Sequence, residues 1–166
     1  MKPEDMLGAA LEMAQAGLTA GELPIGAVVV MGEEVVGRAF TQEKARGRRL
    51  AHADVLAMIE ADEALGWRRR PQPLRLAVSL EPCVMCGRRD DAGVRTVYFG
   101  LESPGDGGTE VAAAWRSSPD TPWFTAPEIV GGIRREESQE LFRRYCAEAP
   151  ESGMRRWAQT LVDQAS

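Results

Sequence analysis

Apolar residues recur along the chain with two different periods, which separate predicted helices from predicted strands. Spacings of three and four residues predict amphipathic helices, and Gly17 is expected to end the first of them. The short continuous apolar run at 25–31, which is rich in valine, predicts a strand that is buried on both faces. The predicted helices cover residues 3–17, 51–65 and 134–147, and a last segment that carries Met154, Trp157 and Leu161. The predicted strands cover residues 25–31, 34–40, 74–80 and 94–100, with a short edge strand at 127–131.

The order of these elements predicts the fold class. Strands alternate with helices after the first hairpin, which favours an α/β sandwich around a mixed sheet. Residues 41–50 are polar and basic without periodicity, and residues 101–109 are rich in glycine, so both segments are predicted to be loops. A length of 166 residues fits a single domain over residues 1–166, with a C-terminal helical extension from about residue 151.

Composition narrows the class of protein. Hydrophobic residues make up 44% and charged residues 27%, which is an ordinary globular balance. The net charge of −5 argues against a surface that binds nucleic acid throughout, although it allows a local basic patch. No apolar run approaches the roughly 20 residues that a membrane span needs, and the N-terminus lacks the features of a signal peptide. Three cysteines are too few for a disulfide scaffold, so we expect a soluble, cytoplasmic protein.

The single histidine and two of the cysteines form a candidate metal site. His52 lies about 30 residues before the pair Cys83 and Cys86, and each group begins a predicted helix. The partial positive charge at a helix N-terminus lowers the pKa of nearby thiols. Two thiolates and one imidazole are a sound set of three protein ligands for Zn²⁺, and the fourth position is then open to water. Zinc lowers the pKa of such a water to about 7, so hydroxide becomes available at neutral pH.

Each part of this pattern has a simpler interpretation when it is taken alone. A lone histidine is usually a surface or core residue, and a lone CxxC pair is also typical of a redox centre or of half a structural zinc site. A redox pair would leave His52 unexplained, and a structural zinc site needs four protein ligands. Cys146 is the remaining thiol, and its place in a predicted amphipathic helix favours a buried free cysteine. The combination therefore favours an open, catalytic zinc site.

The same residues carry a family resemblance. The pattern resembles the H-x-E…P-C-x-x-C motif of the zinc deaminases. The chain resembles the cytidine deaminase superfamily, within it the branch of tRNA adenosine deaminases and bacterial guanine deaminases, from about residue 5 to about 146. Four segments carry the resemblance: GELPIGAVVV at 21–30, SLEPCVMC at 79–86, VYFG at 97–100 and VGGI at 130–133. It implies a three-layer α/β/α sandwich with about five strands, hydrolytic deamination that depends on Zn²⁺, and a homodimer.

The resemblance also implies a mechanism and reveals one departure from it. In the family, water activated by the metal replaces a ring amino group, and a carboxylate carries protons to the ring and to the departing ammonia. The backbone amide of Cys83 would help to position the attacking oxygen. Asp54 stands where the family usually has glutamate, and its side chain is one methylene shorter. Three interpretations follow: Asp54 shuttles protons in a reshaped site, which we favour; it is an engineered change; or the protein binds ligand with little turnover.

The substrate end of the motif departs from the tRNA enzymes. Thr41 occupies the position where they have a substrate-contacting asparagine, and Arg48-Arg49-Leu50 replaces their Asp-Pro-Thr before Ala51. These departures and the acidic net charge weaken the case for a tRNA substrate. Because the chain resembles a purine-acting branch, the first expectation is a free purine nucleoside or nucleobase, adenosine slightly ahead of guanine, with a triazine or cytosine-like ring also open. The alternative is a tRNA adenosine deaminase. An alternative of another class is a zinc-stabilised ligand-binding module.

Several side chains are candidates for contact with the substrate. Trp123 and Phe124 would stack on a bound base, or they would instead pack under their own loop. Runs of arginine near the expected pocket mouth and elsewhere are candidate RNA contacts, or they are simply solvated surface. The candidate substrate-binding residues are Ile25, Thr41, Ala51, Trp123 and Phe124; the basic candidates are Arg46, Arg48, Arg49, Arg68, Arg69 and Arg70.

Overall fold

A five-stranded sheet forms the centre of the computed structural model, which describes residues 1–67, 69–87, 93–114, 116, 118–120 and 125–165. The strand order is β2-β1-β3-β4-β5. The strands are β1 (Gly26–Met31), β2 (Glu34–Phe40), β3 (Leu74–Leu80), β4 (Val94–Leu101) and β5 (Glu128–Val130). β1 pairs antiparallel with both β2 and β3, whereas β3, β4 and β5 are parallel. The predicted mixed sheet is confirmed.

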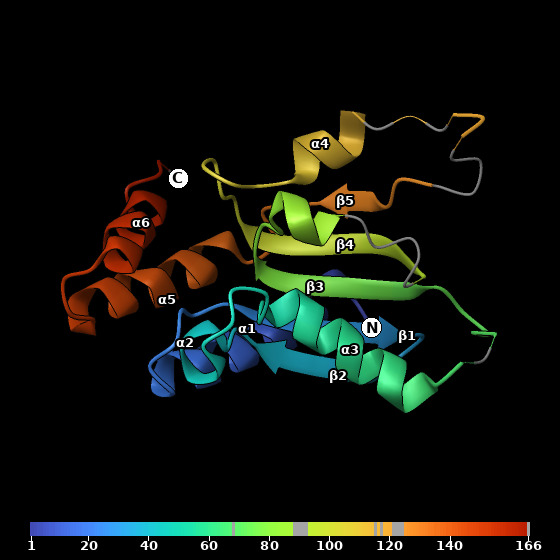
Figure 1. Cartoon of the computed structure of the whole chain (residues 1–166), viewed down its shortest axis with the longest axis horizontal. Coiled ribbons are helices and arrows are strands. Elements are labelled where there is room, and N and C mark those ends of the chain that lie inside the picture. Colours follow the sequence, from blue (N-terminus) through green and yellow to red (C-terminus); the bar gives the residue numbers. More distant parts are fainter. Residues whose placement is uncertain (68, 88–92, 115, 117, 121–124, 166) are drawn as a thin grey trace.

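Helices cover both faces of the sheet (Figure 1). They are α1 (Pro3–Thr19), α2 (Glu43–Arg46), α3 (Ala53–Leu65), α4 (Thr109–Ala114), α5 (Arg135–Glu148) and α6 (Gly153–Val162), with a 3₁₀ turn η1 (Val84–Gly87). α1 packs on one face, where Met6 and Ala10 meet Val28 and Val30. α3 packs on the other face against Val29. These layers confirm the predicted three-layer α/β/α sandwich.

Two glycines let the helices lie close to the sheet. A Cβ atom on Gly26 would stand 2.2 Å from the backbone oxygen of Ala10 in α1. A Cβ atom on Gly37 would stand 2.2 Å from the backbone oxygen of Ala57 in α3. Because no side chain intervenes, both helices approach the strand backbones directly, which sets the height of α3 above the sheet.

The expected end of the first helix is wrong. α1 continues through Gly17 to Thr19. Gly17 is buried, and a Cβ atom there would lie 3.1 Å from Cβ of Phe40 and 3.2 Å from the backbone oxygen of Leu23. Its missing side chain therefore serves close packing against β2 instead of ending the helix.

The expected loop at 41–50 contains the short helix α2. The carboxylate of Glu22, which is only 3% exposed, accepts hydrogen bonds from the backbone amides of Lys44 (3.2 Å) and Ala45 (2.7 Å). This contact satisfies N–H groups that a helix start leaves unpaired. Since Glu22 is about twenty residues away in the chain, local periodicity could not predict α2.

The C-terminal helices pack together at one end of the sheet (Figure 1). Phe142 and Tyr145 of α5 share a core with Ala158 and Leu161 of α6. None of the helices in the described part of the chain is long and apolar enough to cross a membrane.

Candidate metal centre and substrate pocket

Three donor atoms from distant parts of the chain converge at the N-terminus of α3. Nδ1 of His52 lies 3.7 Å from Sγ of Cys83 and 3.6 Å from Sγ of Cys86, and the two sulfur atoms are 3.5 Å apart. Tetrahedral zinc, with Zn–S of about 2.3 Å and Zn–N of about 2.0–2.1 Å, requires S···S distances of about 3.8 Å and N···S distances of about 3.6 Å. The donor set therefore fits a zinc ion in both chemistry and spacing.

Local backbone structure explains how the donors meet. His52 is the N-cap residue of α3, with extended backbone angles, and its carbonyl accepts the first helical hydrogen bond from Leu56. Cys83 directly precedes η1, and the amide of Cys86 donates to the carbonyl of Cys83 over 2.9 Å. The motif on β3–η1 is thus a tight turn that brings its two sulfurs to the same side. Both predicted helix starts are present, although the second is 3₁₀ instead of α.

Asp54 lies in the first turn of α3 and faces the donor cluster. Its side chain is 4% exposed, and Oδ1 is 3.2 Å from Sγ of Cys86, which donates to it. The backbone amide of Val55 also donates to Oδ1, over 2.9 Å. A carboxylate is favourable at this position because the helix N-terminus carries partial positive charge. The shorter side chain therefore still reaches the edge of the metal cluster.

The cluster forms part of a pocket of about 440 Å³. Such a volume is typical of sites for small molecules or single nucleosides. The lining residues are Leu23, Ile25, Thr41, Glu43, His52, Ala53, Asp54, Val78, Leu80, Glu81, Pro82, Cys83, Asp106, Gly153, Met154 and Trp157. Apolar side chains make up most of the wall, and two carboxylates of the lining, Glu43 and Asp54, lie close to donor residues.

Of the five predicted substrate-contacting residues, two line the pocket within the described part of the chain. Ile25 and Thr41 line the pocket, and the Thr41 hydroxyl donates to the carbonyl of Ala51 over 3.1 Å. Ala51 is buried next to His52 but is not part of the pocket lining. Trp123 and Phe124 lie outside the described residues. Substrate contact by these residues stays a prediction.

Two carboxylates near the pocket were missed by the sequence analysis. Oε1 of Glu43, on α2, lies 3.9 Å from Nε2 of His52, the ring nitrogen that faces away from the thiols. Glu81 accepts hydrogen bonds from the amide of Ser103 (2.9 Å) and from the amide and hydroxyl of Thr109. Glu81 thereby ties the loop after β4 to the motif that carries Cys83. The position of Glu81 next to Pro82 and Cys83 could have indicated its role from the sequence. No neighbouring motif indicated a role for Glu43.

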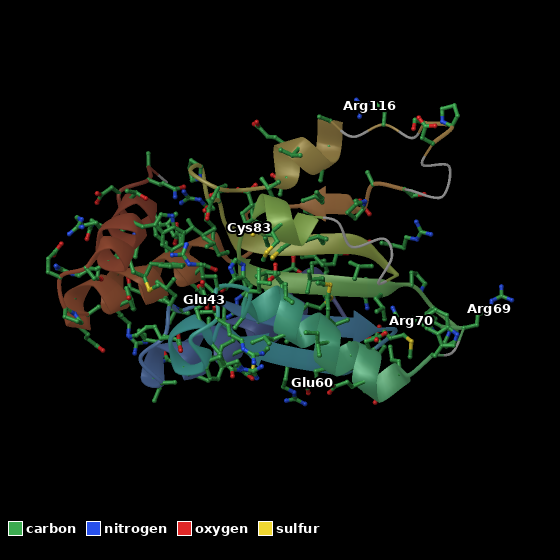
Figure 2. The ribbon with its side chains drawn as sticks, viewed as in Figure 1. Glu43, Glu60, Arg69, Arg70, Cys83 and Arg116 are labelled. Carbon is green, nitrogen blue, oxygen red and sulfur yellow. The ribbon has the colours of Figure 1, made fainter. Side chains whose placement is uncertain are left out.

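The arginine runs differ in their position. Cys83 lies near the middle of the molecule and Glu43 lies on the side of α5 and α6, whereas Arg69 and Arg70 lie toward the opposite end (Figure 2). Arg70 also pairs with Asp62 over 2.9 Å. Arg68 lies outside the described residues. Arg46, Arg48 and Arg49 are exposed on the segment that follows Glu43, so this second basic group lies near the pocket.

Cys146 is buried in the core between α5 and α6, as predicted. Burial raises the pKa of its thiol, which keeps it protonated and unreactive. Its Sγ contacts the carbonyl oxygen of Arg155 at 3.8 Å. Among the described residues it is not part of the donor cluster.

Comparisons with known proteins agree with this geometry. Residues 1–101 match the family model described as the cytidine and deoxycytidylate deaminase zinc-binding region. The chain is 34% identical over 128 residues to a tRNA-specific adenosine deaminase of Agrobacterium fabrum, covering 76% of this chain and 82% of that protein. It is 40% identical over 119 residues to a tRNA-specific adenosine deaminase of Bacillus subtilis, covering 70% and 71%.

Solved structures agree as well. A structure from a study of A-to-I editing by tRNA:A34 deaminases superposes with a TM-score of 0.72 at 33% identity, over 82% of this chain and 98% of that one. A guanine deaminase from Nitrosomonas europaea shares the fold, with a TM-score of 0.70 at 23% identity over 87% of this chain and 84% of that one.

The fold, the donor set and these matches define a zinc-dependent hydrolytic deaminase. The chain belongs to the cytidine and deoxycytidylate deaminase zinc-binding family. The predicted family, reaction class and Zn²⁺ cofactor are thereby confirmed.

Proposed function

We propose that this chain deaminates an adenosine within transfer RNA. The observation that carries the proposal is the donor cluster of His52, Cys83 and Cys86, with the Asp54 carboxylate 3.2 Å from one donor sulfur inside a pocket. Support for the substrate comes from the relatives at 34% and 40% identity, both named tRNA-specific adenosine deaminase. These relatives favour the tRNA alternative over the free purine that the sequence analysis placed first.

In this proposal His52, Cys83 and Cys86 hold the zinc ion. Zinc, when bound, lowers the pKa of a water molecule to about 7 and so supplies the nucleophile at neutral pH. Asp54 accepts one proton of the attacking water and transfers it to a ring nitrogen. It then takes the second proton from the new hydroxyl group and transfers it to the amino group, which leaves as ammonia. The backbone amide of Cys83 helps to position the attacking oxygen. Water and the exocyclic amine are exchanged for a carbonyl group and ammonia, so no oxidant or reductant is needed.

The surface beside the pocket offers a place for RNA phosphates. Arg46, Arg48 and Arg49 are exposed on the segment between α2 and His52. Arginine binds phosphate well, and a local basic segment is compatible with an acidic chain. The arginines of α5 and α6 are weaker candidates, because Arg143 pairs with Glu140 over 2.9 Å and Arg156 pairs with Glu151 over 3.0 Å.

The test is a substrate panel for the zinc-loaded protein. We expect ammonia release from a tRNA anticodon stem-loop that carries adenosine in its loop, and inosine in the recovered RNA. Free adenosine, guanine, cytosine and cytidine should react at least about tenfold more slowly, because they lack the phosphate contacts that supply binding energy. Binding of the stem-loop should weaken steeply with salt. Turnover of free guanine or adenosine without turnover of the stem-loop would contradict the proposal.

A free purine is the second candidate, and two observations favour it. Thr41 replaces the asparagine expected in the tRNA enzymes, and its hydroxyl already donates to the carbonyl of Ala51. α6 adds a wall to the pocket through Met154 and Trp157. The same panel separates the two candidates.

Glu43 is expected to strengthen zinc binding through His52. A carboxylate near the second ring nitrogen fixes the orientation of a ligand histidine and makes it a better donor. We expect Glu43→Gln to lower the zinc affinity about 10- to 100-fold, measured by competition with a chromophoric chelator. Glu60→Gln is a control, because Glu60 lies farther along α3, where it accepts a hydrogen bond from the amide of Arg38 over 3.3 Å. Equal affinities for the two variants would remove Glu43 from this role.

A further inference from the structure

Helix α6 forms part of the pocket wall, although it lies outside the region that the family model matches. Gly153, Met154 and Trp157 share the pocket lining with His52 and Asp54. The matched family region ends at residue 101. α6 lies beside α5, at the end of the sheet where α2 also lies (Figure 1). The substrate pocket is therefore bounded by a helix for which the family match assigns no role.

The start of α6 is held firmly in place. The Ser152 side chain caps the helix by accepting a hydrogen bond from the amide of Arg155 over 3.1 Å. Nε of Arg155 donates to the carbonyl of Cys146 in α5 over 2.7 Å. These two contacts fix the turn that carries Met154 against the end of α5.

The end of α6 is fixed as well. The side-chain amide of Gln139, which is fully buried, lies 3.1–3.2 Å from three carbonyl oxygens at the end of the helix. Ala158 and Leu161 are buried against α5. With both ends anchored, α6 is a fixed wall and not a loose tail.

Trp157 has a defined orientation in this wall. Its ring meets the ring of Phe142 edge to face, with centroids 6.2 Å apart and an angle of 78° between the planes. Phe142 is completely buried, so this contact is part of the core. Trp157 itself is half-buried, and it also lines the pocket. Met154, one helical turn earlier, adds an adaptable thioether to the same surface.

We propose that Met154 and Trp157 are substrate-binding residues that contact the aromatic ring of the substrate base. A purine has apolar faces and a polar edge. An aromatic side chain stacks on such a face whichever base it belongs to. The polar edge then points toward Asp54 and the donor cluster, where the reacting amino group must lie. A base inside a duplex has no free face, so this wall selects an unpaired base. The inference rests on the proposed function, which makes the substrate a base whose ring carries an amino group. It holds for a base within RNA and for a free purine alike.

Binding to the zinc-loaded protein tests this proposal. The probes are an RNA stem-loop with one loop adenosine, free adenosine and free guanine. Stacking of one base corresponds to an affinity change of about 5- to 100-fold. We expect Trp157→Ala to raise the Kd by this factor for every probe that binds the wild type, and Trp157→Phe to stay within about threefold of the wild type. Thr160→Ala, on the exposed side of α6, is the matched control and should bind normally.

Gly153 supplies a variant that leaves the core intact. It lines the pocket, its backbone is not left-handed, and among the described residues a Cβ atom there would meet only the guanidinium of Arg156, at 3.9 Å. We expect Gly153→Leu to fold and bind zinc normally, and to raise the Kd at least about fivefold by narrowing the pocket. This variant decides the question if Trp157→Ala does not fold.

The outcomes separate this inference from the proposed function. Deamination of the stem-loop together with unchanged Kd values in Trp157→Ala and Gly153→Leu would overturn the role of α6 and leave the function standing. A second outcome combines two results: the wild type does not deaminate the stem-loop, and it binds a free purine that Trp157→Ala no longer binds. That outcome would overturn the tRNA substrate and support the role of α6 in binding the base. No binding of any probe to the wild type would overturn both.

Discussion

Asp54→Asn is expected to abolish turnover while the zinc content stays at that of the wild type. The substitution keeps the shape of the side chain and removes its ability to carry a proton. General acid–base catalysis contributes about 10²- to 10⁴-fold, so the turnover number should fall by at least this factor. Zinc should remain, because Asp54 faces the donors without belonging to the three-atom cluster. The measurements are ammonia release and zinc per chain.

Two further variants sharpen the result. Asp62→Asn is the matched control, since Asp62 lies on the same helix but is largely exposed and pairs with Arg70. It should leave the turnover number unchanged. Asp54→Glu restores a carboxylate at the length the family usually has, and should exceed Asp54→Asn by about tenfold or more. Wild-type turnover in Asp54→Asn would exclude Asp54 as the proton shuttle.

Cys86→Ala is expected to remove both zinc and activity. Cys86 is 3% exposed, and its sulfur completes the distances that fit a tetrahedral zinc ion. Two remaining protein donors bind zinc much more weakly than three. Because the metal contributes several kcal/mol to such reactions, turnover should fall about 10³-fold or more. Zinc analysis and ammonia release measure the two losses together.

Cys146→Ala is the control for loss of a buried thiol. Cys146 is 5% exposed and packs between α5 and α6, away from the donor cluster. We expect its removal to lower the melting temperature slightly and to leave zinc content and turnover unchanged. A chelator should abolish wild-type activity, and added Zn²⁺ should restore it. Full activity in zinc-free Cys86→Ala would refute the metal mechanism.

Whether the substrate is RNA or a free purine depends on both the surface beside the pocket and the residues inside it. The relatives named as tRNA enzymes favour RNA, and Arg46, Arg48 and Arg49 offer a basic surface near the pocket. Thr41, which lines the pocket, differs from the asparagine expected in those enzymes. The homodimer expected from the resemblance stays a prediction. Val84, Met85 and Val111 are exposed apolar side chains on η1 and α4 where a second copy would find an apolar surface.

Much of the fold was predictable because its signals are local. β1 is a continuous apolar run and β3 is largely apolar, and both lie where the sequence predicts them, to within one residue. The extents of α3 and α5 follow from helical spacing to within two residues, and α6 contains the three apolar residues that predicted a last helix. The errors arose where distant residues intervene. Gly17 packs against Phe40 instead of ending α1, and Glu22 caps a helix inside an expected loop.

The sequence by itself determined the reaction class. His52, Cys83 and Cys86 are rare residues whose types and spacing already specify zinc, and their motif identifies a deaminase. Only the tertiary structure decided what surrounds the metal. Glu43 approaches His52 because a buried glutamate caps α2, and Trp157 lines the pocket because α6 folds back on α5. Metal chemistry depends on residue type, which a sequence states directly. The shape of a pocket depends on long-range packing, which a local pattern does not contain.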